Sequence, residues 1–169
     1  GLYNASNITN PIESLHGYQA YLAAGTMNID VKGAPITGEQ DFNVTFTTSE
    51  PGEDADFSEA HDGWNLVANP YASTIDWDEA SGWEKTNVAD AIYVWDATLG
   101  QYNVYAGGVG VNGGQNLIPS SQAFWVQTNG SNPVLKINEN AKTSSGAQFK
   151  MDENISVLHL ELSGSSGAD

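Results

Sequence analysis

The stretch that decides the fold consists of Ala91-Ile92-Tyr93-Val94-Trp95, the turn Leu99-Gly100-Gln101 and Tyr102-Asn103-Val104-Tyr105. Short alternating runs on either side of a glycine turn are the pattern of antiparallel β-sheet. Glycine supplies the positive φ that a tight connection between two strands needs. Helical periodicity is weak in the rest of the chain as well. The sequence therefore predicts an all-β protein.

Further strands are predicted on both sides of this stretch, at residues 18–22, 27–31, 42–47, 65–68, 123–127, 134–137 and 155–162. The alternation is clearest in the last of these runs, where Leu158, Leu160 and Leu162 face one way and are expected to enter the core. Packing of such strands predicts an antiparallel β-sandwich with jelly-roll or Greek-key-like connections.

A short internal repeat indicates two related β units. The matching positions are Ile12, Ser14, Tyr18 and Ala20 in the first unit and Ile118, Ser120, Phe124 and Val126 in the second. This alignment predicts the C-terminal part of a first unit at residues 1–50, an acidic linker or loop at 51–62 and a second, complete unit at 63–162. Residues 163–169 are then a linker to a following domain, and an opening segment of the first unit is expected before Gly1.

Acidic side chains dominate the charge of the 169-residue chain. It has 21 Asp and Glu residues against 5 basic ones, all lysines, for a formal net charge of -16. Without arginine, the bidentate forks that grip phosphate or guanine are missing, so nucleic acid is not an expected partner. An acidic surface attracts divalent cations or basic partners and tolerates neutral glycans. Cysteine is absent, which excludes disulfides and thiolate metal sites.

Four segments carry a resemblance to a known family. Residues 63–77 read GWNLVANPYASTIDW, residues 91–96 AIYVWD, residues 112–114 NGG and residues 118–126 IPSSQAFWV. From residue 63 to 142 the chain resembles the β-rich repeats that precede C-terminal sorting domains in large surface proteins exported by the type IX secretion system of Bacteroidota. It departs from that pattern at Ala68, where glycine is common, and at Ala72, where proline is common.

The resemblance implies a place in the cell and brings no catalytic motif. It implies an exported multidomain protein, secreted or held on the outer cell surface, whose neighbouring domains are partners. The chain itself has no run of about eighteen apolar residues, so membrane insertion is not expected.

Tryptophan is unusually frequent, and exposed indoles are surfaces on which sugar rings stack. Trp77 and Trp83 flank a polar loop that includes Asp76, Asp78 and Asn87. These five residues form the candidate glycan-binding site. The alternative is that Trp77 and Trp83 belong to the core, because aromatic side chains dominate the cores of such folds. The remaining tryptophans lie within predicted strands and are expected to be core or half-buried: Trp64, Trp95 and Trp125.

Acidic residues before the second unit are a candidate calcium site. Asp54, Asp56 and Asp62 supply the carboxylate oxygens that this hard cation prefers. The stretch does not match a calcium-loop template, because Glu59 takes the place of the sharp-turn glycine and Asn65 that of the closing glutamate. A solvated acidic loop is the alternative, so the chain is expected to need no cofactor unless calcium binds here.

Two function classes remain open, and catalysis is a distant third. The three histidines are far apart in the sequence and no nucleophile motif is present. The first class is a non-catalytic surface module that binds glycan or another surface polymer, or promotes adhesion. The second is a structural or assembly module that spaces domains or self-associates by strand addition at an unpaired sheet edge.

Overall fold

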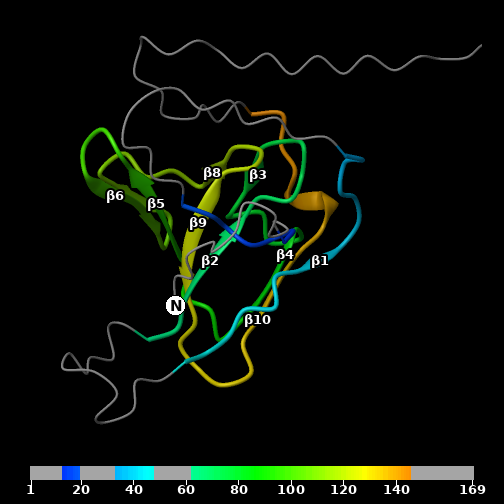
Figure 1. Ribbon diagram of the computed structural model, residues 1–169, viewed down its shortest axis with the longest axis horizontal. Coiled ribbons are helices and arrows are strands. Elements are labelled where there is room, and N and C mark those ends of the chain that lie inside the picture. Colours follow the sequence, from blue (N-terminus) through cyan, green and yellow to red (C-terminus); the bar gives the residue numbers. More distant parts are fainter. Residues whose placement is uncertain (1–12, 20–32, 48–61, 146–169) are drawn as a thin grey trace, which may run out of the picture.

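The computed structural model describes residues 13–19, 33–47 and 62–145, which form an all-β structure (Figure 1). Within these ranges the one helical segment is a short 3-10 helix, Glu139–Ala141. The strands expected at 27–31 and 155–162, and most of the one expected at 18–22, lie outside the described residues. None of the described segments is a helix long and apolar enough to cross a membrane.

The larger sheet has five antiparallel strands in the order β2-β9-β5-β6-β7. They are β2 (Trp64–Ala68), β9 (Ala123–Gln127), β5 (Ala91–Asp96), β6 (Gln101–Ala106) and β7 (Val109–Val111). A short segment from the N-terminal part of the chain extends the sheet beyond β2. There the amide of Gly17 donates to the carbonyl of Leu66, and the amide of Ala68 donates to the carbonyl of Leu15, both at 3.0 Å.

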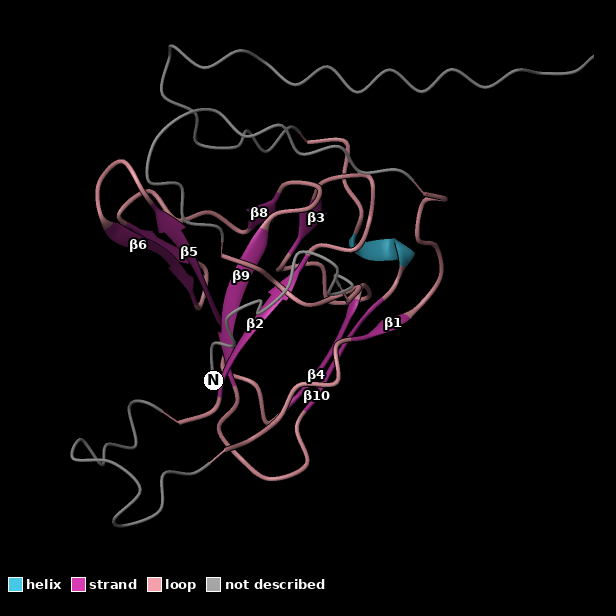
Figure 2. Cartoon of the chain, viewed as in Figure 1, coloured by secondary structure: helices cyan, strands magenta, loops and turns pink. Residues whose placement is uncertain are grey.

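Two smaller antiparallel sheets complete the fold. The first has the order β1-β10-β4, with β1 (Gln40–Asp41), β10 (Val134–Ile137) and β4 (Trp83–Thr86). The second pairs β3 (Ile75–Asp76) with β8 (Leu117–Ile118). The three-stranded sheet lies across from β2 and β9 in Figure 2. The prediction of an all-β fold with antiparallel sheets, consistent with a β-sandwich, is confirmed.

Strand alternation builds the core between the sheets. In β9, Phe124 and Val126 have no exposed surface, and in β10 Leu135 and Ile137 are likewise buried, whereas the residues between them are half-buried. The other large buried side chains come from all three sheets and from the connections between them: Phe42, Val44, Val67, Tyr71, Ile75, Trp77, Trp83, Ile92 and Ile118.

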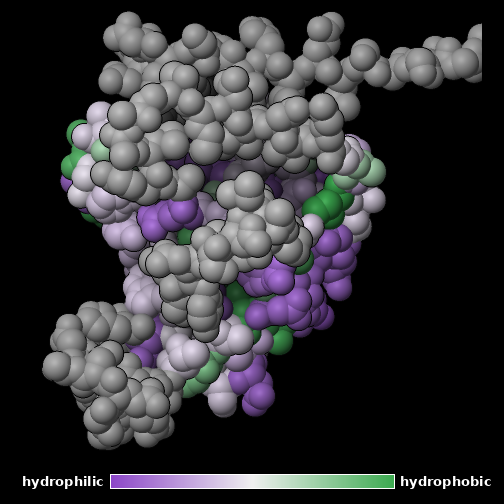
Figure 3. All heavy atoms as spheres, viewed as in Figure 1, coloured by the Kyte–Doolittle hydropathy of each residue, from purple (hydrophilic) through white to green (hydrophobic). Residues whose placement is uncertain are grey.

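The outer face of the three-stranded sheet is charged. Lys136 pairs with Glu84 at 3.3 Å across β10 and β4, and it lies opposite Asp41 of β1. Figure 3 shows hydrophilic residues predominating over this part of the molecule, at the lower right of the view. This sheet therefore follows the usual rule of one apolar and one polar face.

Residues 33–47 pack into the same core as residues 62–145. Phe42 and Val44 are buried among the core side chains, and β1 extends the sheet that contains β10. The prediction that a complete unit begins at residue 63 therefore needs correction. The core of that unit includes side chains from residues 33–47, which were assigned to a first unit. The proposed repeat also fails at its aromatic position, since Tyr18 is 53% exposed whereas Phe124 is fully buried.

Candidate functional site

Trp77 and Trp83, the predicted sugar platform, are core residues. Their exposed fractions are 1% and 9%, and their rings meet edge to face with centroids 4.8 Å apart. Both indole N–H groups are satisfied, because Trp77 Nε1 donates to Asp90 Oδ1 at 3.0 Å and Trp83 Nε1 donates to the carbonyl of Asp76 at 2.8 Å. The prediction that these two indoles form an exposed platform is wrong, and the alternative of a core role is correct.

Lys85 covers this aromatic pair from the solvent side. Its Nζ lies 3.5 Å from the ring centroid of Trp77, donates to the carbonyl of Trp77 at 2.9 Å, and is 3.5 Å from Asp90 Oδ1. Burial lowers the pKa of Lys85, and the carboxylates of Asp90, Asp78 and Asp76 oppose that shift. The two rings, the ammonium group of Lys85 and the carboxylate of Asp90 contact one another. This arrangement is therefore a structural cluster.

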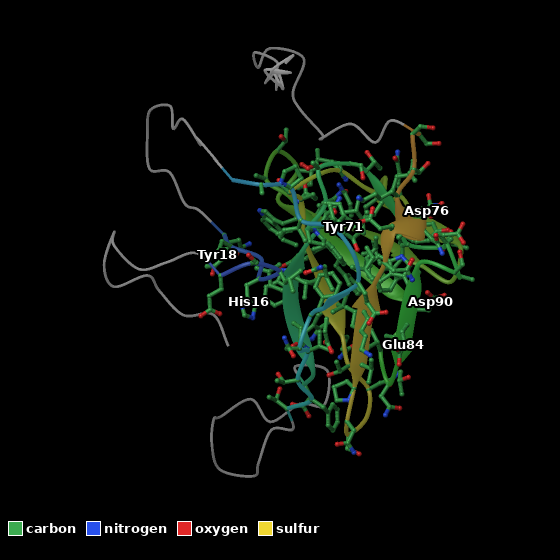
Figure 4. All side chains as sticks on the ribbon, turned by 90° about the vertical axis from the view of Figure 1, so that its right-hand side faces the viewer. His16, Tyr18, Tyr71, Asp76, Glu84 and Asp90 are labelled. Carbon is green, nitrogen blue, oxygen red and sulfur yellow. The ribbon has the colours of Figure 1, made fainter. Side chains whose placement is uncertain are left out.

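The polar residues of the predicted platform have structural partners. Asp76 Oδ1 accepts from the amide of Asp78 at 2.9 Å and from Asn116 Nδ2 at 2.7 Å. Tyr105 donates its hydroxyl to Asp78, and this bond and the charge of Asp78 raise the pKa of Tyr105 to about 12. Asn87 lies apart from them in a turn with φ of 51°, where its Nδ2 donates to the carbonyl of Ser131. Figure 4 shows Asp76 and Asp90 on the side of the molecule that also carries Glu84.

The calcium prediction falls mostly outside the described residues. Asp54 and Asp56 are not among them, and the carbonyl of Asp62 accepts from Gln127 Nε2 at 3.0 Å. Among the residues that the structure does describe, no group of three or more His, Asp or Glu side chains is placed to hold a metal ion. Calcium binding through Asp54, Asp56 and Asp62 stays a prediction.

An aromatic surface that the sequence analysis did not predict covers the outer face of the five-stranded sheet. We call it the aromatic face. Residues directly opposite each other in neighbouring antiparallel strands share a face, and the register pairs Leu66 with Trp125, Trp125 with Tyr93, and Trp95 with Tyr102. The face therefore carries five aromatic rings from four strands: Trp64, Tyr93, Trp95, Tyr102 and Trp125.

The rings of the aromatic face contact one another in two groups. Trp64 lies 4.9 Å from Tyr93 and 6.4 Å from Trp125 between ring centroids, and Trp95 lies 5.0 Å from Tyr102. Each contact is edge to face, with interplanar angles of 76°, 84° and 67°. Neighbouring rings therefore alternate in orientation and do not form a single flat plane.

Aliphatic side chains complete the aromatic face, and none of its strand positions is charged. The strand positions between the rings are Leu66, Val104, Val109 and Val111, with alanines and Gln127 around them. The five strands contain a single charged residue, Asp96, which belongs to the opposite face and is buried. The outer face of the three-stranded sheet is charged, whereas this one is apolar. An exposed apolar surface of this kind is typical of an interaction site.

The exposed part of the aromatic face lies toward β6 and β7. Trp95 is 45% and Tyr102 39% exposed, and the valines of β7 are more than half exposed. Trp95 was expected to be core or half-buried, and that prediction is wrong. Trp95 is three positions after the buried Ile92 in β5, so its side chain lies on the opposite, outer face of the sheet. The two-residue spacing of Tyr93 and Trp95 is the signal in the sequence that points to this face.

The chain matches no protein-family model, and it is not significantly similar to any curated protein or solved structure.

Proposed function

We propose that this chain is a non-catalytic module of a secreted or cell-surface protein, and that it binds neutral glycan through the aromatic face. The observation that carries the proposal is the row of five aromatic side chains on a sheet face without a charged residue. The place in an exported protein rests on the resemblance of residues 63–142 to repeats of type IX-secreted surface proteins.

The chemistry of the face fits the apolar side of a sugar ring. A pyranose presents several C–H groups on one side, and a partly exposed indole or phenol ring offers an apolar surface of matching size with a polar edge. Trp95 and Tyr102 are the most exposed rings of the face, and Tyr102 adds a hydroxyl that can exchange hydrogen bonds with sugar hydroxyls. These two residues are the centre of the proposed site.

Charge limits the class of glycan. The chain has a formal net charge of -16, and none of its lysines lies on the strand positions of the aromatic face. Sulfated or uronic-acid polymers would be repelled at long range and would find no cation to pair with on the strand positions of this face. The edge-to-face angles between neighbouring rings also favour a single flexible glycan chain over a flat crystalline surface.

Native gel electrophoresis through immobilised neutral polysaccharides tests the proposal. The acidic chain migrates readily, and we expect at least one neutral polysaccharide to retard it. The double variant Trp95→Ala/Tyr102→Ala should lose about tenfold or more in affinity, equivalent to about 1.4 kcal/mol. Glu84→Ala is the matched control, because it removes an exposed side chain from the outer face of the other sheet, where ion pairs contribute little.

Two results would contradict glycan binding at the aromatic face. One is migration of the unmodified chain that no neutral polysaccharide changes. The other is retardation that persists in Trp95→Ala/Tyr102→Ala to the same degree as in Glu84→Ala.

The second candidate function is assembly by strand addition, and β7 is the observation that favours it. β7 is the last strand of the five-stranded sheet, it pairs with β6, and Val109 and Val111 are 62% and 51% exposed. An exposed apolar edge strand recruits another strand. Light scattering after size exclusion at low and high salt separates the two functions, because a monomer under both conditions contradicts assembly and leaves glycan binding intact.

A further inference from the structure

A pocket of about 90 Å³ lies on the opposite side of the five-stranded sheet from the aromatic face. It lies between the inner face of the β5–β6 hairpin and the connection from β7 to β9, and its apolar wall includes Ile92, Val94, Ile118 and Pro119. One water needs roughly 10–15 Å³ of such space. The pocket therefore has room for a chemical group of several non-hydrogen atoms.

Asn103 lines this pocket and has an unused hydrogen-bond acceptor. The residue is 7% exposed and lines the pocket, and its Oδ1 has no hydrogen-bond partner among the residues that the structure describes. Leaving a buried acceptor unsatisfied costs about 1–3 kcal/mol. A partner that enters the pocket would recover that free energy.

The orientation of the Asn103 amide is determined by Asp96. Asn103 Nδ2 donates to Asp96 Oδ2 at 3.4 Å, while Asp96 Oδ1 accepts from the amides of Thr98 and Leu99. An ionised carboxylate accepts hydrogen bonds and cannot donate them. The amide nitrogen must therefore face Asp96, and Oδ1 is the atom left unpartnered.

The remaining wall of the pocket is preformed by backbone. At Gly114, a Cβ would lie 1.9 Å from the carbonyl oxygen of Val104, so the connection after β7 packs directly against β6. On the same wall, Gln122 Nε2 donates to its neighbour Ala123 at 2.7 Å. None of the described residues that line the pocket carries a charged side chain, which favours a neutral occupant.

We infer that this pocket binds an acetamido group, such as that of an N-acetylated sugar. The amide N–H donates to Asn103 Oδ1, and the methyl group packs against Ile92, Val94 and Ile118. The inference concerns a different surface from the aromatic face and does not depend on glycan binding there.

Titration of the isotope-labelled protein followed by NMR tests this inference. N-acetylglucosamine and glucose are the matched probes, because they differ in the acetamido group, and N-methylacetamide reports the amide without a sugar. We expect saturable shifts of the Ile92, Val94 and Ile118 methyl signals with N-acetylglucosamine and with N-methylacetamide, at millimolar affinity, and none with glucose. Saturation by N-methylacetamide alone assigns the pocket to amides of non-sugar origin.

Asn103→Leu is the decisive variant, because leucine has nearly the same shape as asparagine and no acceptor. It should weaken binding of N-acetylglucosamine about tenfold or more. Val94→Ile narrows the pocket without touching Asn103 and serves as a second variant if Asn103→Leu does not fold. Glu84→Ala, on the outer face of the three-stranded sheet, should bind the probe in the pocket as the unmodified protein does.

Four results would overturn the inference. The first two are equal shifts with glucose and N-acetylglucosamine, and shifts confined to the aromatic face. The third is undiminished binding by a folded Asn103→Leu or Val94→Ile variant. The fourth is no saturable shift of the Ile92, Val94 and Ile118 methyl signals with either amide probe. None of them bears on retardation by polysaccharide, so failure here is distinguishable from failure of the proposed function.

Discussion

At the scale of single residues, Gly63 shows how tightly the entrance to β2 is built. Its φ is +71°, and a Cβ would lie 2.1 Å from the carbonyl oxygen of Thr128. The carbonyl of Gly63 in turn accepts from the amide of Thr128 at 2.8 Å, and its amide donates to the carbonyl of Thr47 at 3.2 Å. This glycine therefore joins the five-stranded sheet to the segment that precedes it.

We predict that Gly63→Ala destabilises the protein far more than Gly100→Ala does. Gly100 also has positive φ, at +62°, but a Cβ there meets nothing within 4 Å, so its cost is the backbone strain of about 1–2 kcal/mol. Gly63→Ala adds the clash with Thr128 to the same strain and should cost several kcal/mol. Urea unfolding of both variants gives the comparison, and equal midpoints would show that the β2 entrance relaxes freely.

Tyr71 is a buried residue whose ionisation affects the stability of the protein at alkaline pH. Its hydroxyl donates to the carbonyl of Gly38 at 2.6 Å, and its ring is buried. Burial raises the pKa of Tyr71 to about 12, and the negative charges of Glu139 and Glu39 add to the shift. The folded state therefore keeps a proton that the unfolded chain loses near pH 10.

The predicted result is a stability that falls as the pH rises from about 10 to about 12. In that window the folded state binds more protons than the unfolded state, so the free energy of unfolding decreases with pH. The raised pKa of Tyr105 acts in the same direction, whereas the lowered pKa of Lys85 acts in the opposite one. Tyr71→Phe isolates one contribution: its stability should fall less steeply across this window in denaturant titrations, and a slope identical to that of the unmodified protein would contradict the assignment.

At the scale of elements, the strands that alternate most regularly were predictable from the sequence. The expected strands at 123–127 and 134–137 coincide with β9 and β10, and those at 91–95 and 102–105 with most of β5 and β6. The two-residue strands β1, β3 and β8 were missed, and the expected strand at 42–47 is not a strand in the structure. β4 and β7 were also missed, because one carries charged residues and the other lies within a glycine-rich stretch. Whether such an edge segment forms a strand depends more on pairing with the neighbouring strand than on its own residues.

The location of the candidate site was less predictable than the strands. Trp77 and Trp83 lie in a polar stretch, yet the fold turns both indoles inward and satisfies their N–H groups with Asp90 and Asp76. Trp95 lies in an apolar strand, yet its face of the sheet is the outer one. Local sequence reports which residues alternate, but which of the two faces becomes the core depends on the packing of the other sheet.

The two faces of the five-stranded sheet should therefore respond differently to truncation. Phe124→Ala removes a fully buried ring and should cost about 3–5 kcal/mol. Trp95→Ala, on the opposite face, should cost about 1 kcal/mol or less, because the residue is 45% exposed and a surface substitution changes stability little. Chemical denaturation of the two variants measures the difference, and comparable losses would mean that the aromatic face is covered in solution.

At the scale of the whole molecule, one core holds together segments that are distant in the sequence. Phe42 and Val44 are 2% and 8% exposed, and β1 reaches Lys136 and Ile137 of β10. The same segment is attached at its other end, where Thr128 Oγ1 donates to the carbonyl of Thr45 at 2.9 Å. The charge of the chain opposes compaction, so the loss of such core side chains is not easily tolerated.

A fragment of residues 62–145 should therefore not fold by itself, although it contains the whole five-stranded sheet. It lacks Phe42 and Val44, and loss of a buried phenylalanine side chain alone costs about 3–5 kcal/mol, a large share of the stability of a typical domain. Adding a peptide of residues 33–47 should restore a cooperative thermal transition, monitored by near-ultraviolet circular dichroism of the buried tryptophans. The same peptide with Phe42→Ala is the control and should restore much less. A cooperative transition of the fragment alone, unchanged by either peptide, would show instead that a complete unit does begin near residue 63.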